Sequence, residues 1–498
     1  MDNRESIGSR TFDVTDQEQF ASMSGDVNPM HVDPVAARRT MFGRPVVHGV
    51  HVVLWALDVW CSEFQSSTLG IAKLTADFVK PVFVDDVVAL SIVGTDDRTA
   101  RLRVTIDDVV VTTVRVELHS GQASTPGNGW DALGAHRTPS GLRSPRDRDL
   151  DDLAGDTGTV IAPGPLDGWN ERFPALAVRL GPDCVAAIAA LSTIVGMECP
   201  GLHSLFGGFA VRLASRPDPD WVSDAGEREV HPSGVDYRVS QVNAKFSTVK
   251  LAVRGLVLDG EVRAFVRPRP TVQRATGELS TMVQPQEFCD VNALIVGGSR
   301  GLGEVAAKLI AAGGGHSTLS WHRGRAEAER VVADIRAAGF AAESTQLDVN
   351  DVDVELHPDV PYTHLLYFAS PRISARRLRR FDRDLFDRLV DAYVDGFLRI
   401  ADAVIAHSTQ LVVLYPSSIY VTDGGPDFLE YAAAKAAGEV AAEMWAAAHG
   451  GAVVHIERLE ALATDQTVAL ISVGASDAAE PVVRMLRAMH GVAAGQQH

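Results

Sequence analysis

The sequence predicts two consecutive α+β repeats followed by an α/β domain with a doubly wound parallel sheet. The first observation is a helical apolar run over residues 48–64, which is followed by several strand-like runs. The second is that residues 184–266 repeat this order of one apolar helix and several strands. The third is an alternation of strands and helices from about residue 291, which is typical of a parallel sheet.

The first repeat predicts one long helix against an antiparallel sheet. Apolar residues recur in it at helical spacing, namely Val50, Leu54, Leu57 and Cys61. The runs IAKLTADFV, VVALSIVG, ARLRVTI and VVVTTVRVEL then have the composition and alternation of strands. This order of elements indicates a sheet wrapped around a helix.

The second repeat is predicted to be an internal duplication with little sequence identity. An Ala-rich helical run covers residues 184–197 and is followed by the loop ECPGLHS and by strand-like runs. Arg44-Pro45 stands just before His48, as Cys199-Pro200 stands just before His203, and each pair opens an apolar run. We therefore expect both repeats to share one fold.

Two stretches rich in Pro, Arg and small or polar residues, near 121–153 and 267–288, are predicted to be linkers. They divide the chain into domains over residues 1–150, 151–285 and 286–498. A chain of 498 residues agrees with this number, since domains contain about 150 residues on average.

Composition excludes several classes of protein. With 46% apolar and 22% charged residues the chain is globular, and its net charge of −18 argues against nucleic acid as a partner. The four cysteines lack metal-ligand spacing and are too sparse for a disulfide framework, so we expect reduced thiols, no metal and a cytoplasmic protein. The N-terminus has no apolar signal region and the run 184–197 is too short to span a bilayer, so no membrane partner is expected.

A first candidate site lies in SMSGDVNPMH, residues 22–31, which brings an acid, an amide and an imidazole close together in sequence. A carboxylate and an imidazole that converge on one water could add it to a polarised double bond or remove it. The alternative is a turn in which Asp or Asn caps a following helix.

The motif SGDVNPMH, followed by VDPVAA and FGRPVVHG, resembles the MaoC-like (R)-specific enoyl-CoA hydratase/dehydratase family over nearly the whole first repeat. The resemblance implies a hot-dog fold in which Asp26 and His31 hold the catalytic water and Asn28 supports their geometry. It also implies that the backbone N–H of Gly49 polarises the thioester carbonyl, aided by the dipole of the helix that begins there. His48 is expected to be structural.

In the second repeat the place of this motif falls on GPDCVAA, residues 181–187, which lacks a histidine. The second repeat is therefore predicted to be chemically empty. It resembles the degenerate half of double hot-dog hydratases, in which one half keeps the chemistry and the other shapes the acyl pocket. His203 and Glu198 are assigned no role.

A second candidate site combines VGGSRGLG, residues 296–303, with YAAAK and YPSSIY. Glycines between a strand and a helix let the backbone approach a pyrophosphate at the helix N-terminus. Tyr431 and Lys435 share one helical face, and a lysine near a phenol favours the phenolate. Tyr431 can then pass a proton to a carbonyl oxygen that Ser418 holds. The alternative for YAAAK is an Ala-rich surface helix.

Together these motifs resemble the short-chain dehydrogenase/reductase family over residues 290–470, which implies a Rossmann-type fold. By this resemblance Ser418, Tyr431 and Lys435 carry catalysis, Lys435 also contacts the cofactor, and Asp348 meets the adenine. The remaining cofactor contacts fall in the glycine loop, on Gly297, Ser299, Arg300, Gly301, Leu302 and Gly303.

The second strand of this domain ends in SWHRGR, with no acid before Glu327. Arg300 and Arg323 can therefore face a 2′-phosphate, which favours NADPH and the reductive direction. The chain departs from the family where residues 368–371 read FASP instead of Asn-Asn-Ala-Gly and where Tyr393 replaces the usual catalytic asparagine. It also lacks an obvious seventh strand.

The two resemblances predict consecutive chemistry on acyl-CoA or acyl carrier protein thioesters: reduction of a 3-oxoacyl group, then dehydration of the (R)-3-hydroxyacyl product. We expect a bifunctional homodimer that serves fatty-acid-like or polyketide-like biosynthesis. One alternative runs both enzymes oxidatively with NAD. Another makes the C-terminal domain a non-catalytic nucleotide-binding or dimerisation module.

Overall fold

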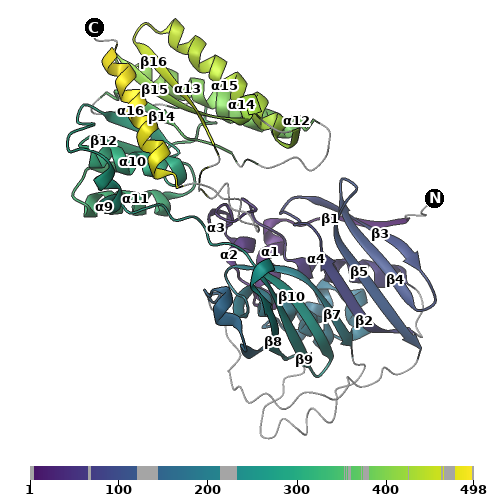
Figure 1. Cartoon of the computed structure of the whole chain (residues 1–498). Coiled ribbons are helices and arrows are strands. Elements are labelled where there is room, and N and C mark those ends of the chain that lie inside the picture. Colours follow the sequence, from purple (N-terminus) through teal and green to yellow (C-terminus); the bar gives the residue numbers. More distant parts are fainter. Residues whose placement is uncertain are drawn as a thin grey trace. The chain divides into compact units, whose positions relative to one another are not determined.

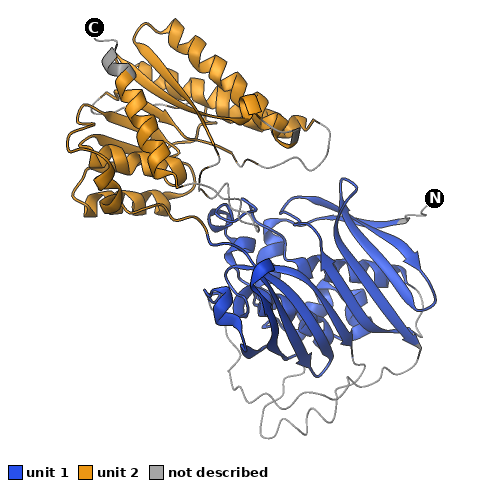
Figure 2. Ribbon diagram, viewed as in Figure 1, with its two compact units in different colours: residues 1–269, 469–471 blue, residues 270–468, 472–498 orange. Residues whose placement is uncertain are grey.

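The protein is seen here in a computed structural model that divides into two compact units (Figure 2). Unit 1 comprises the described residues up to Arg269 and unit 2 those from Pro270 onward. The structure describes residues 5–64, 69–120, 144–213, 233–352, 354, 356, 361–371, 373, 381–423, 426–460, 462, 464 and 477–495.

Unit 1 contains one antiparallel sheet of ten strands (Figure 1). Their order is β1 (Glu5–Thr11), β3 (Val87–Thr95), β4 (Thr99–Ile106), β5 (Val109–Ser120), β2 (Leu69–Phe78), β7 (Ser204–Leu213), β10 (Leu258–Val266), β9 (Thr248–Gly255), β8 (Val235–Asn243) and β6 (Thr157–Val160). The first five strands come from the first predicted repeat and the last five from the second. The halves join where β2 pairs with β7, from Lys73 opposite Arg212 to Asp77 opposite Gly208.

Each half contributes one long apolar helix to the core. These are α4 (Gly49–Glu63), as the sequence predicted, and α7 (Pro182–Thr193), which continues as the π-helical η2 (Ile194–Glu198). Every residue of α7 from Cys184 to Thr193 is buried, as expected for a helix that is apolar on all sides. The shorter helices are α1 (Val14–Ser24), α2 (Pro29–Val32), α3 (Pro34–Ala37), α5 (Leu166–Arg172) and α6 (Pro174–Leu180).

One part of the predicted correspondence between the repeats is wrong. Arg44-Pro45 precedes helix α4, whereas Cys199-Pro200 follows α7 and η2 and precedes strand β7. The residues of GPDCVAA likewise open α7 instead of occupying a loop like that of residues 25–28. A short apolar run can form a helix or a strand, so an X-Pro pair in front of it does not identify equivalent elements.

Unit 2 has a six-stranded sheet in which every neighbouring pair is parallel, which confirms the predicted α/β class. The order is β13 (Ala342–Gln346), β12 (His316–Trp321), β11 (Asn292–Val296), β14 (His364–Tyr367), β15 (Leu411–Ser418) and β16 (Ala452–Leu459). No seventh strand extends it within the described residues of unit 2.

Helices cover both faces of this sheet. Alternate residues of β11 enter two separate cores, Ala293 and Ile295 on the face of α10 and α16, and Leu294 and Val296 on the face of α13 and α15. The helices are α9 (Thr276–Leu279), α10 (Gly301–Ala312), α11 (Arg325–Ala337), α12 (Arg383–Val390), α13 (Gly396–Ile405), α14 (Tyr420–Asp423), α15 (Leu429–Ala448) and α16 (Ala479–Gly495), with the π-helical η5 (Asp391–Asp395) between α12 and α13.

The second predicted linker is largely part of unit 2. Leu279 of α9 and Phe288 are fully buried in its core, and Thr276 donates two hydrogen bonds to Asp334. Of the first predicted linker, residues 121–143 lie outside the described residues. After them, Arg146 pairs with Glu198 at 2.6 Å, so this part packs on the second half of unit 1.

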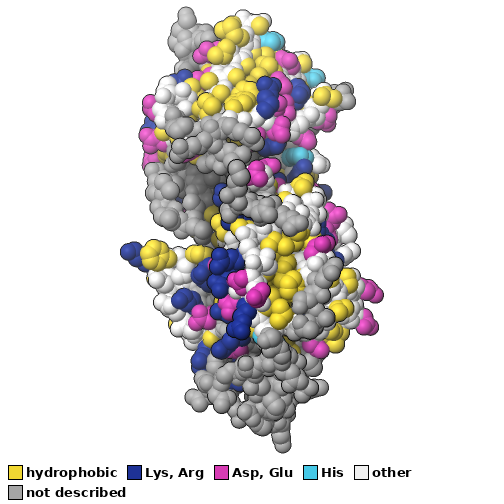
Figure 3. All heavy atoms as spheres, turned by 90° about the vertical axis from the view of Figure 1, so that its right-hand side faces the viewer, with side chains coloured by type: hydrophobic (Ala, Val, Ile, Leu, Met, Phe, Trp, Pro, Cys, Tyr) yellow, Lys and Arg dark blue, Asp and Glu magenta, His cyan; other side chains and the backbone are white. Residues whose placement is uncertain are grey.

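Surface charge is not spread evenly. Figure 3 shows Lys and Arg side chains gathered in places on a chain whose formal net charge is −18.

Among the described residues no single helix meets the length and hydropathy of a bilayer span; α6 and α7 with η2 meet them only as a pair bent by 109°.

Candidate active sites

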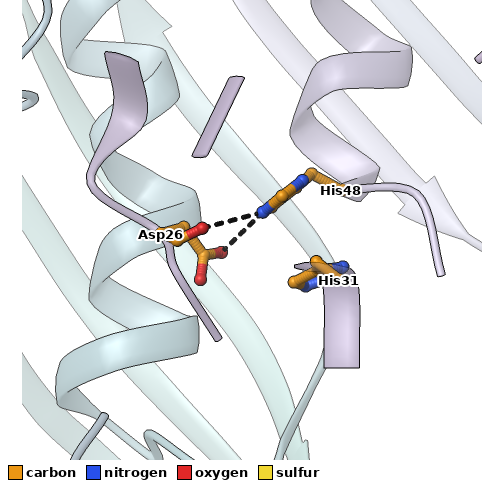
Figure 4. Close-up of side chains that lie close together, drawn as sticks. All are labelled: Asp26, His31 and His48. Carbon is orange, nitrogen blue, oxygen red and sulfur yellow. Dashed lines mark hydrogen bonds and ion pairs between the residues drawn. The ribbon is translucent and has the colours of Figure 1, made fainter. Parts of the chain in front are cut away.

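Three buried titratable side chains of unit 1 converge on one point. The nearest nitrogen and oxygen atoms of Asp26, His31 and His48 all lie within 4.8 Å of one another (Figure 4). Asp26 comes from the loop between α1 and α2, His31 from α2, and His48 from the residue before α4. The structure thus brings the predicted acid and imidazole together, and it adds His48.

His48 contacts both of the other residues. Its ring stacks on that of His31 with centroids 3.9 Å apart, and its Nε2 lies 2.9 Å from the backbone oxygen of Asp26. Its Nδ1 lies 3.0 Å from Oε1 of Gln17, on α1. Burial lowers the pKa of His48 well below its usual value. The structural role expected for His48 stays a prediction.

The tautomer of His31 follows from its partner. Nδ1 lies 2.6 Å from the carbonyl oxygen of Val46, which can only accept, so Nδ1 carries the proton. In the neutral ring Nε2 is therefore left with a lone pair. Burial lowers the pKa of His31, and the charge of Asp26 opposes this shift.

Asp26 is held by hydrogen bonds from both halves of unit 1. The backbone N–H of Asn28 donates to Oδ1 at 3.2 Å, and the hydroxyl of Ser192 on α7 donates to Oδ2 at 2.6 Å. Burial raises the pKa of Asp26, while His31, Ser192 and Asn28 act to lower it. Because burial raises the pKa of Asp26 and lowers the pKa of His31, the two values approach each other. The pair can therefore exchange a proton with a bound water.

The second half, which was predicted to be chemically empty, contributes contacts to the carboxylate of Asp26. Besides Ser192 it contributes Gly196 in the π-helical turn, where a Cβ atom would collide with the carboxylate of Asp26. Asn28 caps α2 with its oxygen and donates from Nδ2 to the carbonyls of Gly196 and Gly201 at 2.8 and 3.2 Å, so its side chain connects the loop of Asp26 to the second half. The polar pair Ser192-Thr193 within an otherwise apolar helix was the available signal.

Gly49 is the first residue of α4, and its N–H therefore has no partner within the helix. The ring of Phe78 packs 2.8 Å from where a Cβ of Gly49 would stand, and Phe78 contacts Phe206 with ring centroids 5.1 Å apart. An amide at a helix N-terminus beside apolar rings suits the oxygen of an acyl thioester. The two residues left without a role have polar partners: Nε2 of His203 lies 3.1 Å from Oδ1 of Asp147, and Glu198 forms an ion pair with Arg146.

In unit 2 the glycine loop lies between β11 and α10. Gly297 and Gly301 have φ of +81° and +60°, and Gly303 packs against the oxygen of Gly297 so closely that a Cβ would collide. Ser299 and Arg300 precede the helix, while Leu302 lies in its first turn. The glycines let the backbone turn tightly at a helix N-terminus, so the residues present fit the pyrophosphate of a dinucleotide.

Asp348 and Arg323 lie beyond the carboxyl ends of β13 and β12, as expected for residues that contact the adenosine part of a dinucleotide. Asp348 is half-buried and its Oδ2 is 3.2 Å from Nε2 of His322, whereas Arg323 is exposed. His322 is thus a third polar group at this position that the sequence reasoning did not select.

Ser418, Tyr431 and Lys435 lie near one another at the end of β15 and the start of α15. A hydrogen bond with Ser418 lowers the pKa of Tyr431, but burial is the larger effect and raises it. Lys435 is buried and its Nζ donates to the carbonyl oxygen of Pro416 at 2.8 Å. Burial lowers the pKa of Lys435 to about 7, so it is only partly protonated at neutral pH.

Tyr393, in the position expected for asparagine, is fully buried in η5. Its hydroxyl lies 2.6 Å from Oγ of Ser370, and the Nζ of Lys435 lies 3.9 Å from the centre of its ring. The backbone oxygen of Tyr393 accepts from the hydroxyl of Tyr415 at 2.9 Å. The ring of Tyr393 and the carbonyl oxygen of Pro416 therefore lie beside the ammonium group of Lys435.

Two protein families match the chain. Residues 3–116 match the MaoC like domain, and residues 291–470 match the short chain dehydrogenase family. An (R)-specific enoyl-CoA hydratase of Aeromonas caviae is 31% identical over 84 residues, which are 17% of this chain and 63% of the hydratase. The chain thus spans less than two thirds of the length of this relative.

Several solved structures are similar to part of this chain. A 3-oxoacyl (acyl-carrier-protein) reductase from Agrobacterium tumefaciens with NADP bound is 18% identical, with 37% of this chain and 76% of the reductase covered and a TM-score of 0.33. A short chain dehydrogenase from Burkholderia cenocepacia in complex with NADP is 22% identical. The match covers 40% of this chain and 90% of the dehydrogenase, with a TM-score of 0.35.

Proposed function

Because the chain combines a MaoC-like domain with a short-chain dehydrogenase domain, we propose that it is a bifunctional enzyme of acyl-thioester metabolism. One site reduces a 3-oxoacyl thioester and the other dehydrates the (R)-3-hydroxyacyl product to the 2-enoyl thioester. The reactions are consecutive because the first creates the hydroxyl group that the second removes. We assign them to fatty-acid-like or polyketide-like biosynthesis on CoA or acyl carrier protein.

We further propose that unit 1 is a double hot-dog. The support is the mirrored strand order on either side of the β2–β7 pair and the presence of one long apolar helix in each half. In this arrangement the second half shapes the acyl pocket and also holds Asp26 through Ser192.

The buried convergence of Asp26 and His31 carries the hydratase proposal. In the hydration direction the ionised carboxylate of Asp26 and the neutral ring of His31 accept hydrogen bonds from one water. The oxygen of this water forms a bond to C3. The pair takes one proton from this water and returns one to C2, so the charge balances. The N–H of Gly49 stabilises the negative charge that develops on the thioester oxygen. Dehydration is the same sequence reversed.

In the reductase site NADPH, when bound, supplies a hydride to C3 of the 3-oxoacyl group. Tyr431 donates the proton to the ketone oxygen, Ser418 holds this oxygen, and the charge of Lys435 favours loss of the phenol proton. Arg323, exposed beyond β12, is the proposed partner of the 2′-phosphate, with Arg300 in the glycine loop. No acid that would contact a 2′-hydroxyl stands between Trp321 and Arg325.

The test of both activities is a synthetic 3-oxoacyl thioester incubated with the protein and NADPH or NADH, followed by mass analysis of the product. We expect the enoyl thioester, with NADPH preferred. Accumulation of the hydroxyacyl thioester alone would overturn the hydratase half. Turnover only with NAD and the hydroxyacyl substrate would favour the oxidative alternative.

The second candidate, a C-terminal domain without catalysis, is favoured by one observation. Lys435 donates to Pro416 and lies on the ring of Tyr393, so part of its ammonium group is already engaged. NADPH binding without reduction of any 3-oxoacyl thioester would support this candidate.

A further inference from the structure

Arg267 is a buried cation that the proposed function does not use. It follows β10, only 5% of its surface is exposed, and its Nη2 donates to the carbonyl oxygen of Leu202 at 2.6 Å. Its Nε is buried without a hydrogen-bond partner. Within the described part of the chain, no carboxylate lies at ion-pair distance from it.

The acids nearest in sequence and space are already engaged by a neighbour. Arg269, which is half-exposed, pairs with Asp147 at 2.8 Å and with Asp149 at 3.0 Å. Asp147 also lies 3.1 Å from Nε2 of His203, whose backbone oxygen accepts from the N–H of Arg267. The local carboxylates thus neutralise the exposed arginine and leave the buried one.

Arg267 is connected to the hydratase site through a single carbonyl group. The oxygen of Leu202 that accepts from Arg267 also accepts from Nδ2 of Asn28 at 3.4 Å, and the N–H of Asn28 donates to Asp26. The positive charge of Arg267 lowers the pKa of His31, so its field reaches the reacting centre. Burial lowers the pKa of Arg267 only to about 10, so the group stays charged at neutral pH.

A desolvated charge without a counter-ion is unfavourable for the fold, and such groups are typical of binding sites for charged ligands. We propose that Arg267 binds a negatively charged group of the thioester substrate, an inference that rests on the proposed hydratase. The ligand chemistry is an oxyanion, which suits a guanidinium with a free N–H. It can be a carboxylate on the acyl chain or a phosphate of the carrier arm.

The test compares Arg267→Met with the matched control Arg269→Met, whose arginine is exposed and paired. Hydration is measured on three substrates: the crotonyl thioester of N-acetylcysteamine, which has no anion; crotonyl-CoA, which has phosphates; and an N-acetylcysteamine enoyl thioester with a terminal carboxylate. We expect R267M to lower kcat/KM about ten- to a hundredfold on an anionic substrate and less than about threefold on the neutral one.

The substrate that loses rate identifies the source of the anion: crotonyl-CoA indicates the carrier phosphate and the carboxylate substrate indicates the acyl chain. Equal loss on all three substrates, or none on any, would overturn the proposal, as would the same pattern in R269M. If R267M does not fold, R267K retains the charge without the fork, and we expect the same selectivity with a smaller loss.

A binding measurement separates this proposal from the proposed function. Inorganic phosphate or succinate is titrated into the full-length protein, and we expect one of them to raise the Tm of the wild type and of R269M but not of R267M. A wild type that hydrates the neutral crotonyl thioester but binds neither anion through Arg267 overturns the inference alone. Arg267-dependent binding without any hydration overturns the hydratase and leaves the anion site.

Discussion

In unit 1 an acid and an imidazole lie close together in a buried site, and loops and helices of both halves of the unit hold them. In unit 2 a tyrosine and a lysine share one helical face, but a carbonyl and an aromatic ring occupy part of the space around the lysine ammonium. Both sites keep their motif residues. They differ in the neighbours of those residues, since Asn28 keeps its supporting place in the first site and Tyr393 replaces an amide in the second.

A motif specifies the reacting groups, whereas their protonation states depend on the neighbours that the fold supplies. His31 has its proton fixed on Nδ1 by Val46 and is ready to accept at Nε2. Burial lowers the pKa of Lys435 to about 7, so only part of the population carries the charge that can assist Tyr431 at neutral pH. We therefore expect the first site to tolerate fewer changes and the second to depend more strongly on pH.

The largest effect is expected for Asp26→Asn, which retains the shape of the side chain and removes its charge. Hydration of crotonyl-CoA should fall by about two to four orders of magnitude in kcat, the usual contribution of a positioned acid or base. Asp77→Asn, at a half-exposed aspartate of β2 that pairs with Arg263 at 2.8 Å, is the control. Unchanged hydration in Asp26→Asn, with the circular dichroism spectrum of the wild type, would contradict the assignment.

A second large effect is expected for Tyr431→Phe, which removes the proton donor and leaves the glycine loop intact. Reduction of a 3-oxoacyl thioester should fall at least about a hundredfold, while NADPH affinity, followed by fluorescence, stays within about threefold. Tyr362→Phe, on a tyrosine remote from the motif in sequence, is the control. Reduction that survives in Tyr431→Phe would show that another group donates the proton.

Cofactor choice should respond more weakly, through Arg323→Ala. Loss of a charge-assisted contact to the 2′-phosphate should weaken NADPH binding about ten- to a hundredfold and leave NADH nearly unchanged. Arg325→Ala, two residues further on and paired with Glu329 at 2.7 Å, is the control. Equal weakening of both nucleotides would place Arg323 away from the phosphate.

Much of the fold could be predicted because the decisive patterns are local. The apolar spacing from Val50 to Cys61 gives α4, and the strand and helix alternation gives the parallel sheet of unit 2. The glycines of the cofactor loop could also be predicted from the sequence. At Gly303, for example, only a residue without a Cβ fits beside the oxygen of Gly297.

What the sequence does not reveal is set by contacts between distant segments. Ser192 reaches Asp26 across 166 positions, and no periodicity predicts which polar residue of a buried helix faces which loop. Arg267 is similar, because it looks like part of a polar linker until the fold buries it beside Leu202. The wrong match of Cys199-Pro200 with Arg44-Pro45 has the same origin, because a short apolar run in a sequence can form either a helix or a strand.

The smallest effect is expected for Ser192→Ala. This variant tests whether the second half of unit 1 takes part in the acid–base chemistry of the first. The hydroxyl donates to Oδ2 of Asp26 at 2.6 Å and so stabilises the carboxylate, which lowers the pKa of Asp26 against the larger effect of burial. Removal of this hydrogen bond should raise that pKa further. Because hydration needs the ionised carboxylate, the acidic limb of kcat/KM should move to higher pH, with less than about a tenfold loss at the optimum.

Two controls make this shift specific to the hydrogen bond across the halves. Ser192→Thr keeps a hydroxyl and should restore the wild-type limb, and Ser62→Ala, at the exposed end of α4, should not move it. A merely structural role for Ser192 would lower stability and kcat without moving the limb. If the acidic limb of the pH profile does not move in Ser192→Ala, the second half only shapes the pocket. If the limb shifts and threonine reverses the shift, the second half takes part in the acid–base chemistry of the first half.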